Sequence, residues 1–367
     1  MRTIRLGYVG CGFMAQKVHL PNFTTIPGCE VIALAEVRQE LGRRVQARFG
    51  IPRFYPDAST MFADPEIEAV AVSAAFSVQG DIAREALLAG KDVFMEKPMA
   101  ISLAQADAIL DASQRSGRRL MVGYMKRYDA GNELVKRQID DFKQSGEIGA
   151  ITYARNHGFC GDWVAGIDLP LESVAEAKPA PPTAENLPAW LPADCADGYG
   201  DYVNQWTHNI NLLRFLLEAG DRARVRTVDL DPEDKSSGVA LLDVDGVRCS
   251  LETGRLSYHR WDEHTQVYFE HGWVHTWAPP LLLRNAVAEV EIYRHDRTGA
   301  PGQLGEAGVQ HSATRAIPEP RWSWAYKNEA AHFVECLLNG AEFGSTGEDT
   351  LTDVRLIEEI YRTWLNR

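Results

Sequence analysis

Apolar and polar positions follow two alternating periods over about the first 125 residues of the chain. Short, nearly continuous apolar runs alternate with stretches in which apolar residues recur at helical spacing. The expected strands lie at 3–10, 30–37, 69–75, 91–96 and 119–124, and the expected helices at 13–25, 39–49, 79–90 and 102–117. Apolar strands that alternate with helices predict a doubly wound parallel sheet covered on both faces, an α/β fold of the Rossmann type.

The pattern changes after about residue 148. A strand is expected at 150–159, residues 160–200 contain six prolines and few periodic runs, and a helix is expected at 202–220. Several β-rich runs follow at 223–294, and helices are expected at about 322–339 and 347–365. We therefore expect a Rossmann domain at 1–125 and an α/β domain with an open, largely antiparallel sheet at 126–367. The C-terminal helices are expected to pack back on the first domain.

Composition narrows the range of partners. The 38 basic and 51 acidic residues give a formal charge of −13, which argues against nucleic acid or an anionic membrane as the main partner. No apolar run approaches the roughly 18 residues that a membrane span needs, and the first residues enter a strand pattern without a signal-peptide core. The six cysteines show neither Cys-x-x-Cys nor metal-ligand spacing. These features predict a cytoplasmic protein without a metal.

The turn after the first expected strand carries a dinucleotide-binding pattern. In GYVGCGFMA, Gly10, Gly12 and Ala15 fit G-x-G-x-x-A between a strand and a helix. The first glycine permits the tight turn, the second allows the backbone to approach a pyrophosphate, and Ala15 allows the helix to pack closely on the strand. The positive end of the helix dipole favours the phosphates. We expect this turn, with Phe13 and Met14, to bind the cofactor.

Glu36 bears on the choice of cofactor. It ends the second expected strand, 21 residues after Ala15, where an acid would bind the ribose diol. A carboxylate at this place repels a 2′-phosphate, by several kcal/mol at about 4 Å and an effective dielectric constant of about 20. NAD is therefore expected rather than NADP. Arg38 leaves the alternative open, because an arginine two residues further on can accommodate a phosphate.

Four segments together resemble the Gfo/Idh/MocA family of sugar and polyol oxidoreductases. They are GYVGCGFMA, EALLAGKDVFMEKPMA, VGYMKRYD and EDTLTDVRLIEEIYR, and the similarity extends over nearly the whole chain in order and spacing. The resemblance implies that Lys97 of the EKP motif reaches the nicotinamide and the substrate hydroxyl, and that Glu96 helps to hold the cofactor end. Lys97 also follows a strand at the carboxyl edge of the sheet, where ligands bind and an ammonium can stabilise a developing alkoxide.

The segment NQWTHNINLLR carries a second motif of the resemblance. Family members place an aspartate and a histidine one helical turn apart, so that both face the sugar. This chain has His208, with Asn204 in place of the aspartate and Asn211 in place of a frequent later aspartate. A histidine titrates near neutrality and suits the role of accepting the hydroxyl proton. Asn204 can orient the imidazole or bind a substrate hydroxyl, but it cannot stabilise an imidazolium by charge.

Other positions depart from the family pattern or suggest substrate contacts. Ala74 and Ala75 replace a Thr-Pro pair and Gln79 replaces a frequent histidine, and all three are expected near the cofactor. GYMKRYD resembles GFMRRYD of inositol dehydrogenases, so Lys126 is a candidate substrate contact, whereas Arg127 is expected to be structural. The other candidates for substrate binding are Tyr124, Asn156, Trp163 and Tyr202, with Trp206 as a further aromatic residue for stacking on a sugar. Ordinary core packing is the competing interpretation of each aromatic residue.

We therefore expect an NAD-dependent oxidoreductase that acts on a ring hydroxyl of a sugar, glycoside or cyclitol. Lys97, Lys126 and Arg127 form a local group of cations, which indicates either a substrate with an anionic group or ordinary solvated lysines. Two alternatives stay open. One is an NAD-dependent glycosidase that oxidises its sugar transiently, eliminates the aglycone and reduces the product again; the other is a non-catalytic sensor of NAD and sugar. The resemblance implies a homodimer or homotetramer formed through the open sheet face.

Overall fold

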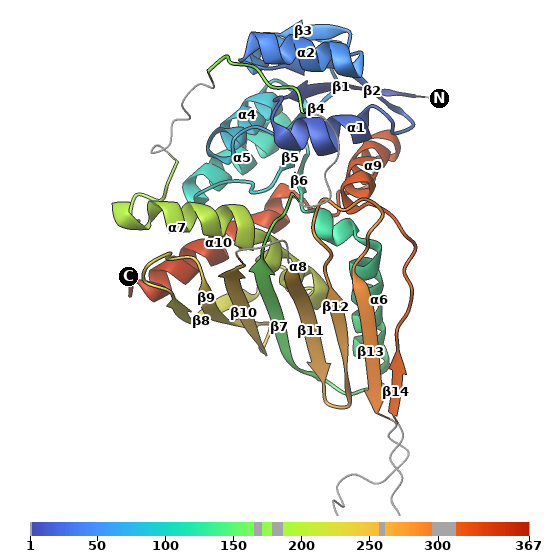
Figure 1. Cartoon of the computed structure of the whole chain (residues 1–367), viewed down its shortest axis with the longest axis vertical. Helices are drawn as coiled ribbons and strands as arrows, with labels where there is room; N and C mark the ends of the chain where they lie inside the picture. The colour runs from blue at the N-terminus through green and yellow to red at the C-terminus, as the bar shows by residue number, and fades with distance from the viewer. Residues whose placement is uncertain (1, 165–170, 178–185, 257–260, 296–312, 367) are drawn as a thin grey trace, which may run out of the picture. The chain divides into compact units, whose positions relative to one another are not determined.

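A computed structural model describes residues 2–164, 171–177, 186–256, 261–295 and 313–366 (Figure 1). The chain divides into two compact units, and neither is a continuous stretch of sequence. Unit 1 comprises Met1–Met125, Ile167–Thr207 and Ala325–Glu358, and unit 2 comprises Lys126–Gly166, His208–Trp324 and Glu359–Arg367. Each unit is built around its own sheet. Within the described ranges, no helix is both long and apolar enough to cross a membrane.

Unit 1 contains a six-stranded parallel sheet in the order β3-β2-β1-β4-β5-β6, which confirms the predicted Rossmann-type fold. The strands are β1 (Ile4–Val9), β2 (Cys29–Ala35), β3 (Arg53–Tyr55), β4 (Ala69–Val72), β5 (Asp92–Glu96) and β6 (Leu120–Gly123). The helices are α1 (Leu20–Phe23), α2 (Gln39–Phe49), α3 (Ala58–Phe62), α4 (Phe76–Leu88), α5 (Leu103–Ser116), α7 (Ala196–Asp201), α9 (Ala325–Asn339) and α10 (Gly347–Trp364), the last of which continues into unit 2 after Glu358.

The central strands of unit 1 are apolar on both faces because helices cover both sides of the sheet. All residues of β4 and β6 are buried, and the apolar core includes Val70 and Val72 together with Ile109 on α5. Local signals define the helix ends: the Ser102 hydroxyl accepts a hydrogen bond from the Gln105 N–H at 3.3 Å and so caps the start of α5. Packing of these amphipathic helices then supplies most of their stability.

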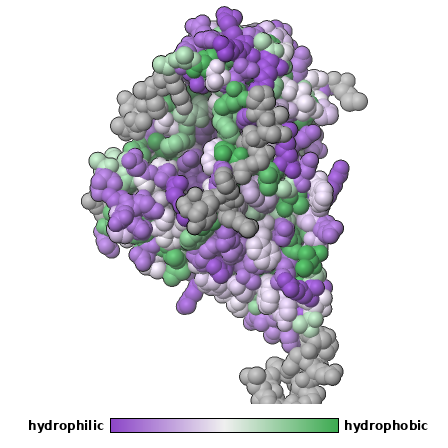
Figure 2. Space-filling view, in the orientation of Figure 1, coloured by the Kyte–Doolittle hydropathy of each residue, from purple (hydrophilic) through white to green (hydrophobic). Residues whose placement is uncertain are grey.

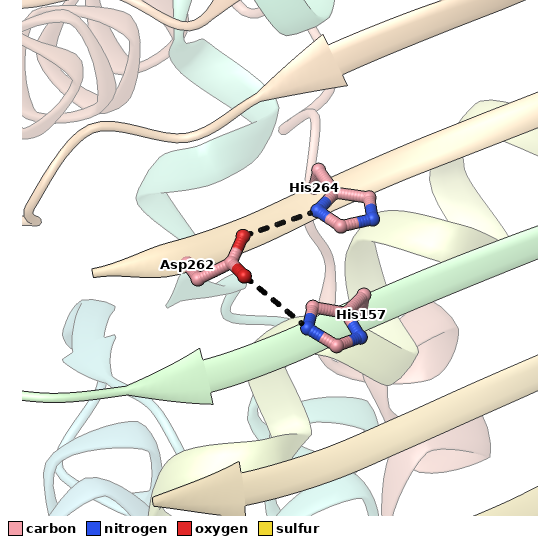
Figure 3. A group of neighbouring side chains, drawn as sticks. All are labelled: His157, Asp262 and His264. Carbon is pink, nitrogen blue, oxygen red and sulfur yellow. Dashed lines mark hydrogen bonds and ion pairs between the residues drawn. The ribbon is translucent and has the colours of Figure 1, made fainter. Parts of the chain in front are cut away.

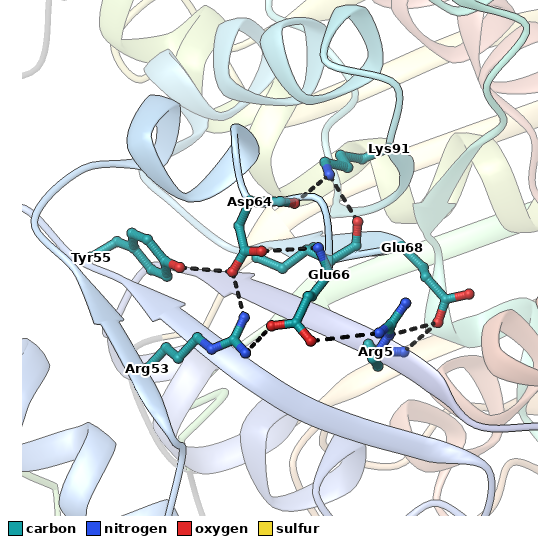
Figure 4. Close-up of polar contacts among 8 residues, drawn as sticks. Arg5, Arg53, Tyr55, Asp64, Glu66, Glu68 and Lys91 are labelled. Atoms are coloured by element: carbon teal, nitrogen blue, oxygen red, sulfur yellow. Dashed lines mark hydrogen bonds and ion pairs between the residues drawn. The ribbon is translucent and has the colours of Figure 1, made fainter.

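A network of polar side chains closes the amino-terminal edge of the unit 1 sheet (Figure 4). The carboxylate of Asp64 accepts hydrogen bonds from Arg53 at 2.7 Å and from the Tyr55 hydroxyl at 2.8 Å. The ammonium of Lys91 donates to the carbonyl oxygens of Asp64 and Ile67, each at 2.8 Å. These contacts fix the loop that leads into β4. They lie away from the carboxyl ends of the strands, which is the edge where open α/β sheets bind ligands.

The structure adds elements that the hydrophobic pattern does not predict. Strand β3 and helix α3 span only three and five residues, too few for a clear period. The helix expected at 13–25 is instead a π-helical segment, Ala15–His19, followed by the single turn α1. Pro21 lies at the start of α1, where its missing N–H is tolerated.

Unit 2 contains an eight-stranded sheet in the order β14-β13-β12-β11-β7-β10-β9-β8. Only the pairing of β7 with β10 is parallel, so the prediction of a largely antiparallel sheet is confirmed. The strands are β7 (Ile151–Cys160), β8 (Ala223–Leu230), β9 (Gly238–Val244), β10 (Val247–Arg255), β11 (Asp262–Phe269), β12 (Gly272–Trp277), β13 (Glu289–His295) and β14 (Ala313–Ala316). The helices of this unit are α6 (Ala130–Ser145), which the sequence analysis does not predict, and α8 (Thr207–Leu217) from His208 onward.

Helices cover one face of the unit 2 sheet, and no helix of the described residues covers the other, which we call the open face (Figure 1). Along β7, alternate residues from Ala154 to Cys160 are buried, while Tyr153, Arg155 and His157 are partly exposed. This period of two is typical of a sheet with a single covered face. Figure 2 views the open face, which is coloured mostly purple to white, from hydrophilic to neutral.

The covered face of unit 2 contains a buried polar network. Lys126 and Glu263 form an ion pair, and their side chains are 5% and 1% exposed. The side-chain amide of Asn209 on α8 donates to Asn156 Oδ1 at 2.6 Å and to Glu263 Oε1 at 3.2 Å. Asn156 in turn donates to the Thr265 hydroxyl at 2.7 Å. The network therefore connects α8 with β7 and β11 through side chains that leave few polar atoms unused.

We expect the substitution Lys126→Met to reduce the free energy of unfolding by about 3–5 kcal/mol, because it leaves the Glu263 carboxylate buried without a cation. The matched control is Lys143→Met, which breaks an ion pair of 3.3 Å with Glu218 whose side chains are 37% and 68% exposed. This control should cost about 1 kcal/mol or less. Urea denaturation followed by circular dichroism measures both. Equal losses in the two variants would contradict a structural role for Lys126.

Candidate active site

The glycine-rich turn between β1 and the π-helical segment Ala15–His19 has the local geometry of a pyrophosphate-binding turn. Gly10 has φ +100°, and a Cβ at this residue would lie 2.5 Å from the carbonyl oxygen of Ser73, so a side chain is excluded. Among the described residues, a Cβ at Gly12 would meet no atom within 4 Å, which leaves space at the outer side of this glycine. Tight backbone at the first glycine and free space at the second are what a pyrophosphate at this turn requires.

Glu36 follows β2 and is held against the same turn. Its Oε2 accepts a hydrogen bond from the Cys11 N–H at 2.7 Å, and its Oε1 accepts one from Arg38 Nε at 2.9 Å. The guanidinium of Arg38 is thus paired with the carboxylate on which cofactor choice depends. These residues fit NAD: the open space at Gly12 accommodates phosphate, and the Glu36 carboxylate is placed as an acceptor for a ribose diol.

Lys97 follows the last residue of β5, and its backbone is fixed from two sides. The side-chain amide of Gln79, buried on α4, donates to the carbonyl oxygens of Glu96 and Pro98, each at 2.8 Å. The Glu96 carboxylate accepts a hydrogen bond from the Lys97 N–H at 3.0 Å, and the Lys97–Pro98 peptide is cis. Gln79 and Glu96 are expected from the sequence to lie at the cofactor. In the structure both are buried and hold the lysine turn.

The ammonium of Lys97 meets Asn204, a residue 107 positions later in the chain. Lys97 Nζ donates to the carbonyl oxygen of Asn204 at 2.8 Å and to its Oδ1 at 3.2 Å. Asn204 lies in a second π-helical segment, Tyr202–Trp206, which belongs to unit 1. Short π-helical segments interrupt the regular hydrogen-bond ladder and are frequent at functional sites. Unit 1 therefore brings together two of the three residues predicted to be catalytic.

Behind the lysine turn, three buried titratable residues form a cluster that the sequence analysis does not predict. His19 Nε2 lies 2.8 Å from Glu96 Oε1, and Glu329 on α9 is fully buried. One imidazole nitrogen and one carboxyl oxygen from each acid can be chosen so that all three atoms lie within 4.8 Å of one another. Among the described residues, neither oxygen of Glu329 has a hydrogen-bond partner. Burial, and next the negative charge of Glu96, hold the pKa of Glu329 well above its usual range, so that it stays a neutral acid beside a carboxylate.

The other residues predicted to belong to the site are distributed over both units and differ in burial. Ala75 is the N-cap of α4 and follows Ala74, so both lie at the start of a helix at the carboxyl edge of the sheet. The Tyr124 hydroxyl bonds the Thr207 hydroxyl at 2.7 Å, inside unit 1. Arg127 Nε donates to Asn211 Oδ1 at 2.7 Å, inside unit 2. The exposure of the remaining predicted residues differs widely: Tyr202 and Trp206 are fully buried, Trp163 is 42% exposed and His208 is 3% exposed. Burial raises the pKa of Tyr202, as expected for a core residue.

We expect Glu329→Gln to remove a pH dependence of stability. A raised pKa in the folded state means that the native protein holds this proton while the unfolded chain, with a pKa near 4.5, releases it. The contribution of Glu329 is fully present below pH 4.5 and is lost as the pH rises toward the folded pKa. The free energy of unfolding of the wild type, relative to Glu329→Gln, should fall by up to about 1.4 kcal/mol per pH unit as the pH rises above the unfolded pKa.

Urea denaturation at several pH values measures this difference. Glu335→Gln, at an exposed position on the same helix, is the matched control and should follow the wild type. Parallel stability curves for wild type and Glu329→Gln would show that Glu329 is ionised in the folded protein.

Comparison with known proteins shows similarity to a family of oxidoreductases. Residues 4–124 match the model of the family GFO_IDH_MocA, described as "Oxidoreductase family, NAD-binding Rossmann fold". An inositol 2-dehydrogenase of Pseudomonas fluorescens is 34% identical over 149 residues, which are 40% of this chain and 43% of that protein. A D-apiose dehydrogenase of Paraburkholderia graminis is 26% identical over 360 residues, 96% of this chain and 85% of that protein.

A solved structure shares the fold. The aldose-aldose oxidoreductase of Caulobacter crescentus superposes with a TM-score of 0.72 at 22% identity, covering 100% of this chain and 98% of that one. The chain spans less than half the length of the inositol dehydrogenases that it matches at 33–34% identity. The family match, the glycine turn and the fold agree with the predicted resemblance and with NAD as the cofactor. Residues 4–124 of this chain are thus similar to the oxidoreductase family GFO_IDH_MocA, with its NAD-binding Rossmann fold.

Proposed function

We propose that this protein is an NAD-dependent oxidoreductase that acts on a ring hydroxyl of a sugar, glycoside or cyclitol. The observation that carries the proposal is the placement of the Lys97 ammonium, which is anchored at the carboxyl end of β5 and held by two oxygens of Asn204. It lies in the unit that also contains the glycine turn and Glu36. The named relatives, an inositol dehydrogenase and an apiose dehydrogenase, support a polyhydroxylated substrate.

Lys97 would act on the hydroxyl that is oxidised. Its ammonium has three N–H donors, and Asn204 accepts hydrogen bonds from it at two oxygens, so the cation is oriented before substrate arrives. A hydrogen bond from this cation to the substrate oxygen is stronger when the oxygen becomes an alkoxide, and such a difference lowers the barrier. Bound NAD would supply the acceptor for the hydride that leaves the carbon.

His208 is proposed to take the hydroxyl proton. The proposal rests on the spacing of Asn204 and His208, four positions apart in NQWTHN, and on the resemblance to the family. The hydroxyl proton passes to the imidazole while the hydride leaves the same carbon, so the ring alcohol becomes a ketone, or a lactone where that carbon is anomeric. Asn204 replaces a charged partner of the imidazole with a neutral one. It also holds Lys97, which gives this substitution a second role.

The sequence predicts a local group of three cations, Lys97, Lys126 and Arg127, and the structure pairs one of them with a carboxylate. The charge of Lys126 is offset by Glu263 inside unit 2, so Lys97 is the better supported cation for a substrate contact. We propose a neutral carbohydrate or cyclitol as the substrate class. We also propose a cytoplasmic protein that forms a homodimer or homotetramer through the open sheet face, as the resemblance implies.

The NAD-dependent glycosidase is the second candidate function. Asn204 and the Ala74-Ala75 pair, both departures from the dehydrogenase pattern, favour it. The two functions differ in the fate of the cofactor, because a glycosidase returns its hydride in each cycle and releases an aglycone without net formation of NADH. Incubation of the purified protein with a chromogenic glycoside panel and with a free sugar panel distinguishes them.

We expect NAD to bind at least tenfold more tightly than NADP. The Glu36 carboxylate repels a 2′-phosphate, and Arg38 is already engaged with that carboxylate. Isothermal titration of both cofactors measures the ratio, and Glu36→Gln should bring the two affinities closer. Equal affinities in the wild type would mean that Arg38 turns to accommodate the phosphate.

We expect Lys97→Met to lower kcat by at least about 100-fold while NAD affinity stays within about threefold. The reason is that the ammonium acts on charge that develops during the reaction. Formation of NADH with inositols and aldoses measures turnover, and Lys143→Met is the matched surface control. Near-normal turnover of Lys97→Met on the best substrate would exclude Lys97 from the chemistry.

A further inference from the structure

The open face of the unit 2 sheet contains a second group of convergent side chains, His157, Asp262 and His264 (Figure 3). Asp262 Oδ1 lies 3.3 Å from His264 Nδ1, and Asp262 Oδ2 lies 3.5 Å from His157 Nε2. One donor atom from each of the three residues can be chosen so that all lie within 4.8 Å of one another. None of these residues belongs to the proposed oxidoreductase site.

Strand register brings the three side chains together. His264 on β11 is directly opposite His157 on β7, and Asp262 is two residues before His264, on the same face of its strand. The two imidazole rings stack with their centroids 4.6 Å apart and an interplanar angle of 19°. The two rings therefore lie face to face, and each directs one nitrogen at the carboxylate of Asp262 (Figure 3).

A fourth residue orients one of the imidazoles. Glu252 on β10, the other neighbour of β7, lies 2.8 Å from His157 Nδ1. Arg155 holds the same carboxylate oxygen at 2.8 Å. With Nδ1–H donated to Glu252, His157 presents the lone pair of Nε2 toward Asp262. A carboxylate behind a histidine is the usual arrangement in metal sites, where it fixes the tautomer and raises the basicity of the ligand.

We propose that His157, Asp262 and His264 bind a divalent transition-metal ion of the zinc type on the open face of the unit 2 sheet. Two imidazoles and one carboxylate suit zinc, cobalt or nickel rather than magnesium, which prefers oxygen ligands. Zinc bonds of about 2.0–2.1 Å in a tetrahedron place neighbouring ligand atoms roughly 3.3–3.4 Å apart. The two Asp262–histidine distances, 3.3 and 3.5 Å, are near this value but involve different carboxylate oxygens. One ligand atom from each residue lies within 4.8 Å of the other two, so a small rotation of the exposed Asp262 side chain completes the set.

The site has an open side. The side chains of His157 and His264 are 18% and 16% exposed, and that of Asp262 is 57% exposed. Three protein ligands leave the fourth position of a tetrahedral ion for water or another small ligand. The competing interpretation is an ion-pair cluster in which Asp262 and Glu252 stabilise the histidines without a metal, and the experiment distinguishes the two.

The test is metal binding by the full chain after treatment with a chelator. Isothermal titration should show a Zn²⁺ site with a stoichiometry of about one per chain that is lost in His264→Gln and in Asp262→Asn. Glu252→Gln should weaken binding about 10–100-fold, as expected for a residue that positions a ligand. His271→Gln, in the turn between β11 and β12, is the matched control and should bind as the wild type does. Mg²⁺ should not compete.

Cobalt provides a readout of the geometry. Co²⁺ added to the wild type should give the intense visible absorption of a tetrahedral site, and His264→Gln should lack it. Zn²⁺ binding that is unchanged in both ligand variants, or absent from the folded wild type, would overturn the proposal. Circular dichroism of each variant establishes that the sheet is intact. The outcome is independent of oxidoreductase activity, so failure of one proposal leaves the other standing.

Discussion

The geometry of the candidate active site depends on the buried carboxylate of Glu96. Burying a carboxylate costs several kcal/mol unless hydrogen bonds replace the lost water. Here one oxygen accepts the Lys97 N–H and the other meets the His19 ring. The side-chain amide of Gln79 adds hydrogen bonds to the peptide carbonyls on both sides of the lysine. The turn that presents the ammonium is therefore determined by polar contacts inside the unit, and the ammonium is directed at Asn204.

Both units limit the net charge that they bury, but they do so by different means. In unit 1, burial raises the pKa of Glu329, which favours its neutral form beside the Glu96 carboxylate. In unit 2, the carboxylate of Glu263 faces the ammonium of Lys126. Each arrangement keeps the net buried charge small, although the means are protonation in one and pairing in the other. Neither arrangement follows from composition, because the two acids are far in sequence from their partners.

The features that the sequence predicts are those decided by neighbouring residues. Gly10, Gly12 and Glu36 occupy one strand–turn–helix unit and the end of the next strand, and the alternation of apolar runs was sufficient for both sheet types. The contact between Lys97 and Asn204 joins residues 107 positions apart, and the Lys126–Glu263 pair joins residues 137 apart. Such pairs depend on strand register and helix placement, which the period of a single segment does not specify. Lys126 therefore looked like a free cation in the sequence, although its partner is on β11.

The order of the strands in unit 2 has a consequence for synthesis of the protein. β7 lies at the middle of its sheet, yet its two neighbours begin only at Val247 and Asp262, and unit 1 is incomplete until residues 325–358 have been made. As the chain leaves the ribosome, β7 has two unpaired edges while the intervening stretch is translated. Contacts so distant along the chain form slowly, and unpaired edges can pair with other chains. Neither unit can be completed until about the last tenth of the chain has been translated. The cell must therefore protect the nascent chain until then.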